Sequence, residues 1–140
     1  MVHTSVLVLL PLLLVVVEGD YDEVTMHISG KIECPKNWFH YKMTVWEYDP
    51  ADENDFVADF GWKDSFPEHT YKETAKISGW ESGNCCWEVF LSIQHTCTSD
   101  GRYMTYQVVL ADVDDDKEKV ELKLDIKLFN QEATIESWPT

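Results

Sequence analysis

The chain has 140 residues and a formal net charge of −15 at pH 7. A protein this acidic is not drawn to nucleic acid or to anionic lipid by long-range attraction, which argues against nucleic-acid-binding functions. The same charge predicts a soluble protein that is largely monomeric unless a specific patch pairs two copies.

The N-terminal segment predicts a secretory signal. Residues 4–17 are apolar apart from Thr4 and Ser5. Such a run is short for a membrane helix, which needs about 20 apolar residues, and it suits the apolar region of a signal peptide. We expect a cleaved signal peptide at residues 1–19 and one secreted, extracellular domain at residues 20–140, without stable membrane insertion. An uncleaved membrane anchor is the alternative.

Apolar and polar residues alternate along most of the remaining chain, which is typical of strands with one buried face. The clearest strand is 24–34, and Asp100-Gly101 marks a tight turn between two later strands. Glu73 interrupts an apolar face and predicts an edge strand. The other predicted strands are 40–48, 56–62, 70–78, 86–97, 103–110 and 120–128.

No segment shows a persuasive helical period. About seven strands, with turn signals roughly every ten residues, indicate an all-β, antiparallel sandwich of seven to eight strands.

An alternating strand that ends in His-x-Cys, at Leu91–Cys97, is the most specific of several motifs in this chain. In their order and spacing, these motifs resemble the transthyretin-like family of secreted nematode proteins. The resemblance implies a transthyretin (prealbumin)-like sandwich with Ig-like topology. This chain lacks the further cysteine that usually follows His-x-Cys and carries the pair Cys85-Cys86 instead. The other matching motifs are Ile28–Cys34, Met43–Asp49, Ile77–Gly79 and Leu124–Ile126.

Four cysteines allow three pairings. If strand 70–78 runs antiparallel to strand 24–34 and strand 86–97 returns in the first direction, Cys34 and Cys97 end at the same pole. We therefore favour a Cys34–Cys97 disulfide, with Cys85 and Cys86 at the opposite pole. Those two cysteines are then free, bonded to each other, or bonded to a second chain, so the protein is a monomer or a disulfide-linked dimer.

His95 shares a strand face with Cys97, which raises the possibility of a Cys–His nucleophile. A structural histidine is the favoured interpretation, because a cysteine in a secreted sandwich is usually oxidised.

The histidines show no zinc spacing. Two acidic turns, Asp49–Asp55 and Asp112–Asp116, lack the order of a known calcium loop and are interpreted as solvated surface, with a weak calcium site as the alternative. We predict no metal and no cofactor.

Trp46 and Tyr48 share the outward face of the second predicted strand. Aromatic side chains in such positions are typical anchors of protein interfaces, and ordinary cross-strand packing is the alternative.

We expect a secreted, non-enzymatic module that binds an extracellular protein or cell-surface ligand. A carrier of a small apolar ligand or lipid is the alternative function. Hydroxyisourate hydrolase activity is not expected, because Arg102 is the only arginine and the chain ends Glu136–Thr140 without the Tyr-Arg-Gly-Ser ending of those enzymes.

Overall fold

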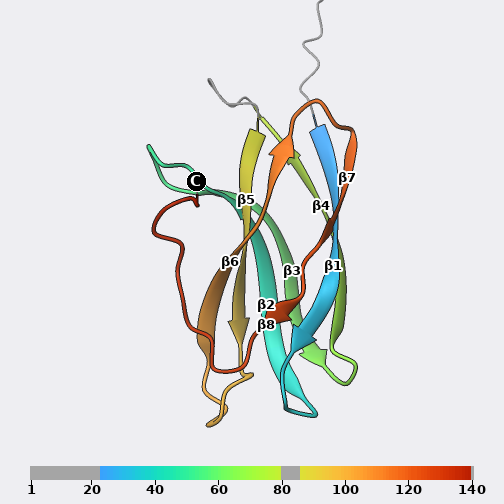
Figure 1. The fold of residues 1–140 in the computed structure, drawn as a ribbon, viewed down its shortest axis with the longest axis vertical. Helices are drawn as coiled ribbons and strands as arrows, with labels where there is room; N and C mark the ends of the chain where they lie inside the picture. Colours follow the sequence, from blue (N-terminus) through green and yellow to red (C-terminus); the bar gives the residue numbers. More distant parts are fainter. Residues whose placement is uncertain (1–22, 80–85, 140) are drawn as a thin grey trace, which may run out of the picture.

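The computed structural model describes residues 23–79 and 86–139. The described residues form eight strands and no helix, and the strands make two sheets that face each other (Figure 1). The sandwich predicted from the alternating sequence is therefore confirmed. The strands are β1 (Glu23–Glu33), β2 (Phe39–Glu47), β3 (Asp55–Ser65), β4 (Thr70–Ser78), β5 (Cys86–His95), β6 (Met104–Asp114), β7 (Lys119–Lys123) and β8 (Ile126–Lys127).

The first sheet has the order β4-β1-β7, and β8 also pairs with β1. β1 and β4 are antiparallel, as predicted, and β4 lies at the sheet edge that Glu73 indicated. The Glu73 carboxylate forms an ion pair with Lys63 of β3, which belongs to the other sheet. A half-buried acid on the inner face is thereby neutralised where the two sheets meet.

The last predicted strand differs from expectation in two ways. It pairs with β1 in parallel rather than antiparallel fashion, and it is divided into β7 and β8. At the break, the Leu124 carbonyl accepts a 2.6 Å hydrogen bond from the Tyr71 hydroxyl, and Asp125 accepts the Lys31 backbone N–H at 2.9 Å. A β-carbon at Gly30 would lie 1.9 Å from the Leu124 carbonyl oxygen, so only glycine admits this approach.

The second sheet has the order β3-β2-β5-β6, with antiparallel neighbours throughout. The predicted hairpin around Asp100-Gly101 joins β5 to β6, and Gly101 has a φ of +76°. β3 and β6 are both longer than predicted, and β6 extends into the second acidic turn as far as Asp114.

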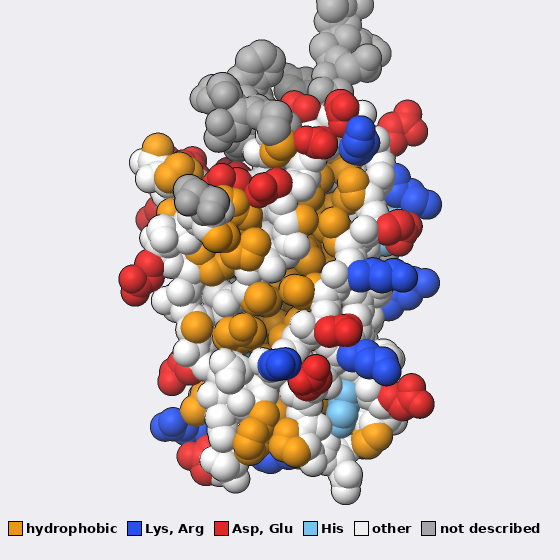
Figure 2. All heavy atoms as spheres, in the orientation of Figure 1, with side chains coloured by type: hydrophobic (Ala, Val, Ile, Leu, Met, Phe, Trp, Pro, Cys, Tyr) orange, Lys and Arg blue, Asp and Glu red, His pale blue; other side chains and the backbone are white. Residues whose placement is uncertain are grey.

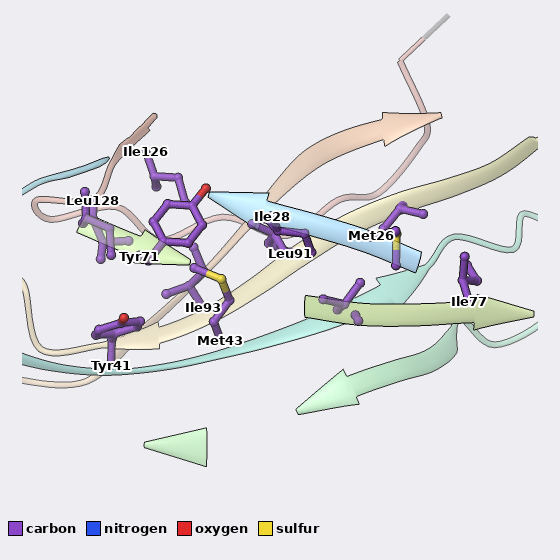
Figure 3. Packing of buried hydrophobic residues seen from close by; sticks show 14 of the residues in the cluster. Met26, Ile28, Tyr41, Met43, Tyr71, Ile77, Leu91, Ile93, Ile126 and Leu128 are labelled. Atoms are coloured by element: carbon purple, nitrogen blue, oxygen red, sulfur yellow. The ribbon is translucent and has the colours of Figure 1, made fainter. Parts of the chain in front are cut away.

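The core lies between the sheets, where the inward side chains of β1 meet those of β2 and β5 (Figure 3). Met26 and Ile28 of β1 and Leu91 and Ile93 of β5 have at most 1 % of their surface exposed. Burial of such a side chain contributes roughly 1.5–3 kcal/mol to the free energy of unfolding. The alternating pattern that predicted these strands therefore also selects the core.

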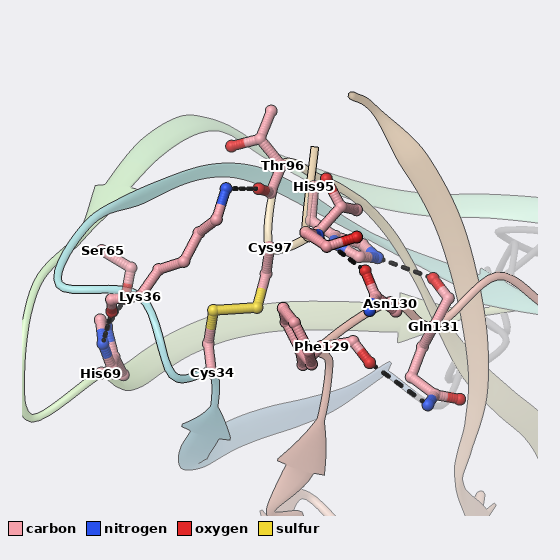
Figure 4. The surroundings of a disulfide bond; sticks show 12 residues. Cys34, Lys36, Ser65, His69, His95, Thr96, Cys97, Phe129, Asn130 and Gln131 are labelled. Atoms are coloured by element: carbon pink, nitrogen blue, oxygen red, sulfur yellow. Dashed lines mark hydrogen bonds between the residues drawn. A yellow bond between two sulfur atoms is a disulfide. The ribbon is translucent and has the colours of Figure 1, made fainter. Parts of the chain in front are cut away.

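A disulfide joins Cys34, directly after β1, to Cys97, just beyond β5 (Figure 4). The Cα atoms are 6.2 Å apart and the sequence separation is 63. The predicted pairing is confirmed. A loop of this length stabilises the fold by about 4 kcal/mol in the chain-entropy description of the unfolded state.

The C-terminal segment after β8 passes from the disulfide pole along the free edge of β6 (Figure 1). Gln107 N–H donates to the Ala133 carbonyl at 2.8 Å, and Ala133 N–H donates to the Thr105 carbonyl at 3.2 Å. The segment therefore satisfies backbone groups that an open sheet edge would leave unpaired.

Candidate interaction surface

A β-bulge in β3 decides which way Trp62 points. Thr44 of β2 pairs with Asp59 and Lys42 pairs with Trp62, so β3 has one residue more than β2 across this interval. Gly61 takes up the extra residue with a φ of +73°. Because successive side chains of a strand alternate between faces, the insertion moves Trp62 from the inner face to the outer face.

Trp62 belongs to a group of aromatic rings on the outer face of the second sheet. Its ring stacks on that of His40 of β2, with centroids 4.8 Å apart and an interplanar angle of 3°. The Tyr103 ring, just before β6, meets Trp62 edge-on at 5.5 Å. Trp62 is 46 % exposed and Tyr103 is 61 % exposed, so both rings are packed and still face solvent.

Trp38 and Tyr103 line a recess of about 410 Å³ at the disulfide pole, next to the stacked rings. Trp38 lies between Cys34 and β2 and is 52 % exposed. We call Trp38, His40, Trp62 and Tyr103 the aromatic patch. The disulfide fixes the two loops that frame the recess, and Lys36 Nζ donates across them to the Thr96 carbonyl at 3.3 Å (Figure 4).

Hydrogen bonds fix the polar groups around the aromatic patch. His40 Nδ1 lies 2.7 Å from Asp64 Oδ1, and the His40 backbone N–H donates to Thr96 Oγ1 at 2.9 Å. Lys42 Nζ lies 2.7 Å from Asp59 Oδ2. The hydrogen bond from Lys42, followed by that from the Gly61 N–H, holds the pKa of the Asp59 carboxyl below its usual value. Two lysines, Lys36 and Lys42, lie at or beside the patch together with two carboxylates, Asp59 and Asp64, so the formal charge of the patch is close to zero.

Trp46 and Tyr48, the predicted anchors, lie toward the other end of the same outer face. Both are half-buried. The Trp46 ring meets Phe56 at 5.3 Å and its Nε1–H donates to Thr44 at 2.9 Å. Tyr48 stacks on Trp138 of the C-terminal segment at 5.7 Å. A role for Trp46 and Tyr48 in binding a partner stays a prediction.

His95 and Cys97 do not form a thiol–histidine pair, because Cys97 is bonded to Cys34. His95 is fully buried, and its Nε2 lies 2.9 Å from the Gln131 carbonyl oxygen, to which it donates (Figure 4). Burial lowers the pKa of His95, which favours the neutral ring. This geometry gives His95 a structural contact rather than a nucleophile to activate.

The described part of the chain contains no group of three or more His, Cys, Asp or Glu side chains arranged to hold a metal ion. In the first acidic turn, Asp49 Oδ1 accepts the backbone N–H groups of Ala51 and Asp52, at 2.7 and 3.2 Å. No free thiol occurs among the described cysteines. Cys85 lies outside the described residues, so its predicted pairing with Cys86 or with a second chain does as well.

The alternating sequence placed Trp46 and Tyr48 on the outer face of the second sheet, where they lie, and it did not predict the aromatic patch. A strict alternation through β3 places Phe60 and Trp62 on the same side, and the bulge separates them. The available signal was Gly61, since a glycine inside a strand pattern often marks a bulge. Trp38 lies outside the strands, where periodicity carries no information about direction. Tyr103 was included in the predicted strand 103–110 but lies just before β6, and nothing in the alternation predicts its contact with Trp62.

Compared with models of known protein families and with curated protein sequences, the chain matches none. Among the described residues, no helix has the length and apolar character needed to cross a membrane.

Proposed function

We propose that this protein is a secreted, non-enzymatic module that binds an extracellular or cell-surface protein in a signalling or bridging role. The observation that carries the proposal is the aromatic patch. Exposed and well-ordered Trp and Tyr rings that lie together on a surface are characteristic of protein interfaces, where such residues supply much of the binding energy. Membership in the transthyretin-like family is part of the proposal, supported by the order of its motifs and by the sandwich fold.

The electrostatics of the patch indicate what kind of partner surface fits. Lys42 is paired with Asp59, and Lys36 shares the recess with Asp64, within a chain whose net charge is −15. A strongly charged partner gains little from such a neutral surface. We therefore propose a partner protein whose contact surface is apolar and weakly charged, with hydrogen-bonding groups at its rim.

The test uses a panel of purified secreted and cell-surface proteins, with affinities measured for the wild type and two variants. Tyr103→Ser removes a ring of the patch, and Phe66→Ser removes an equally exposed ring outside it, both rings being 61 % exposed. We expect Tyr103→Ser to raise the Kd of a binding partner by about tenfold or more. Truncating an aromatic residue that anchors an interface commonly weakens the free energy of binding by over about 1–2 kcal/mol. Phe66→Ser should leave the Kd nearly unchanged. Equal effects of the two variants would contradict the assignment.

One observation favours the alternative, a carrier of a small apolar ligand or lipid. Apolar side chains lie along the open side of the sandwich, between β6 and β7 (Figure 2). Val108 and Leu110 of β6 and Val120 and Leu122 of β7 are only half-buried there. Native mass spectrometry of the protein as purified distinguishes the functions, since a carrier should retain an apolar ligand and an interaction module should show the mass of the polypeptide alone.

A further inference from the structure

The outer face of the first sheet differs in charge from the rest of the molecule. The whole chain has 26 acidic and 11 basic residues, yet more than half of the basic side chains lie on this one face. In Figure 2 lysines gather along the right-hand flank, on the side of β1 and β7. The six are Lys31, Lys72, Lys76, Lys119, Lys123 and Lys127.

The strand register brings three of these lysines around one position. Ser29 of β1 pairs with Lys72 of β4 on one side and with Lys123 of β7 on the other. The Cα atoms of these two lysines are thus about 10 Å apart, two strand spacings. Lys31 lies two residues further along β1 and points to the same face, about 7 Å from Ser29. Three flexible ammonium groups can therefore reach one bound group.

These three lysines line a recess of about 650 Å³, which lies where β7 breaks before β8. We call Ser29, Lys31, Lys72 and Lys123 the lysine recess. In the described part of the chain, Lys76 and Lys119 pair with carboxylates, whereas Lys31, Lys72 and Lys123 take part in none of the ion pairs. Unpaired ammonium groups are unexpected where acids outnumber bases more than twofold.

We propose that the lysine recess binds the sulfate groups of a sulfated polysaccharide. Each ammonium group supplies three donors to anionic oxygens, and the Ser29 and Thr70 hydroxyls that share the recess suit sugar hydroxyls. This site is distinct from the aromatic patch, which lies on the other sheet. Binding there would hold the module in an extracellular matrix while its other face contacts a protein.

The composition of the face favours a polysaccharide over other polyanions. Its outward side chains on β1 are Thr25, His27, Ser29, Lys31 and Glu33, so these positions hold no Phe, Tyr or Trp on which a nucleic-acid base could stack. None of the exposed large apolar side chains among the described residues lines the lysine recess, so nothing there inserts into a lipid layer. A hydrophilic chain with repeated anionic groups matches a recess lined by three ammonium groups and by the Ser29 and Thr70 hydroxyls, beside the single Asp125 carboxylate.

The acidic groups near the recess reduce its charge without cancelling it. Asp125 lies in the recess, where it accepts the Lys31 backbone N–H, while Glu33 and Glu121 lie further along the same face. Three lysines against one carboxylate leave the recess positive. Glu33 and Glu121 are each two residues from a lysine of the recess, about 7 Å along the strand. Acidic residues further away act over distances that salt screens at physiological ionic strength, above about 8 Å.

The test measures binding of the full mature chain to a heparin oligosaccharide at about 50 mM salt and above. The site variant Lys72→Gln/Lys123→Gln is compared with Arg102→Gln/Lys117→Gln, which removes two positive charges from turns elsewhere. We expect the site variant to bind about tenfold more weakly and to lower the slope of log Kd against log salt by between about one and two. The control variant should bind like the wild type.

Three outcomes would overturn the proposal. The first is that the wild type shows no heparin binding at low salt. The second is that both double variants weaken binding equally, which would assign the effect to net charge. The third is that single-stranded DNA, or vesicles containing an anionic phospholipid, bind the wild type more tightly than the heparin oligosaccharide does. All four substituted side chains are exposed, so we expect each variant to keep the fold. Circular dichroism of each variant checks this.

Discussion

His95 shows how a single residue in this fold acquires a structural role. It lies between the sheets with no exposed surface, and Nε2–H donates to the Gln131 carbonyl. Its Nδ1 has no hydrogen-bond partner within the described part of the chain. A neutral ring with one donor satisfied is tolerated there, whereas a protonated ring would bury an unpaired charge. Burial therefore favours the neutral ring, and this lowers the pKa of His95.

The lowered pKa of His95 makes the free energy of unfolding depend on pH. Above about pH 6.5, the ordinary pKa of histidine, the ring is neutral in both states and the contribution to stability is complete. As the pH falls below that value, the unfolded chain binds a proton that the folded chain excludes. Stability therefore decreases toward the lower folded pKa, with a slope of up to about 1.4 kcal/mol per pH unit.

Urea denaturation of the wild type and of His95→Gln between about pH 5 and pH 7.5 measures this effect. The wild type should lose stability more steeply on acidification than His95→Gln, because glutamine does not titrate. His27→Gln, at a half-buried position, serves as the control and should follow the wild type. Parallel pH profiles for wild type and His95→Gln would contradict the assignment.

At the scale of elements, two glycines set the shape of the sheets for different reasons. Gly61 supplies the positive φ of the bulge in β3, and a β-carbon there would meet nothing within 4 Å. Gly30 lies in a regular strand, but a β-carbon there would collide with the Leu124 backbone. The first glycine orients Trp62 on the outer face, and the second allows β7 to break before β8.

The two glycine-to-alanine substitutions should therefore differ in size. Gly61→Ala should lower the free energy of unfolding by about 1–2 kcal/mol, which is the penalty for a non-glycine residue in the left-handed region. Gly30→Ala should cost more, above about 3 kcal/mol, since a backbone segment must move. Equilibrium denaturation measures both values. A smaller loss for Gly30→Ala than for Gly61→Ala would show that the β7–β8 break is not packed as described.

Alternation of side chains predicted β1, β2, β4 and β5 closely, because each has one face against the core. Alternation did not predict the structure of segments whose position depends on backbone contacts rather than on a buried apolar face. Leu124 continues the alternation of the final strand, yet its carbonyl turns to Tyr71 and the strand breaks. The C-terminal segment has weak periodicity because backbone hydrogen bonds to β6, rather than a buried face, hold it in place.

For the molecule as a whole, the sandwich separates two surfaces of different chemistry. The second sheet carries the nearly neutral aromatic patch, and the first carries the unpaired lysines. The Cys34–Cys97 disulfide joins the ends of β1 and β5, so it connects the two sheets at one pole. The sequence was sufficient to predict this disulfide, since the direction of three strands determines which cysteines meet. It was not sufficient to locate either surface, which depends on register and on the bulge.

Removing the disulfide should weaken both the fold and the aromatic recess. Cys34→Ala/Cys97→Ala should lower the free energy of unfolding by about 2–5 kcal/mol, because the unfolded chain regains the freedom of a long loop. Lys36 and Thr96 lie beside the two cysteines, so the recess should also loosen. Denaturation and tryptophan fluorescence measure the two effects. Unchanged stability would contradict a structural role for this bond.

We propose that the outer face of the second sheet is the surface that binds a protein partner. Amide hydrogen exchange of the free chain and of its complex with a partner from the panel tests it most directly. We expect slower exchange on binding in residues 36–42, 62–64 and 96–104, and unchanged exchange in β4 and β7. Protection confined to β1, β4 and β7 would contradict it.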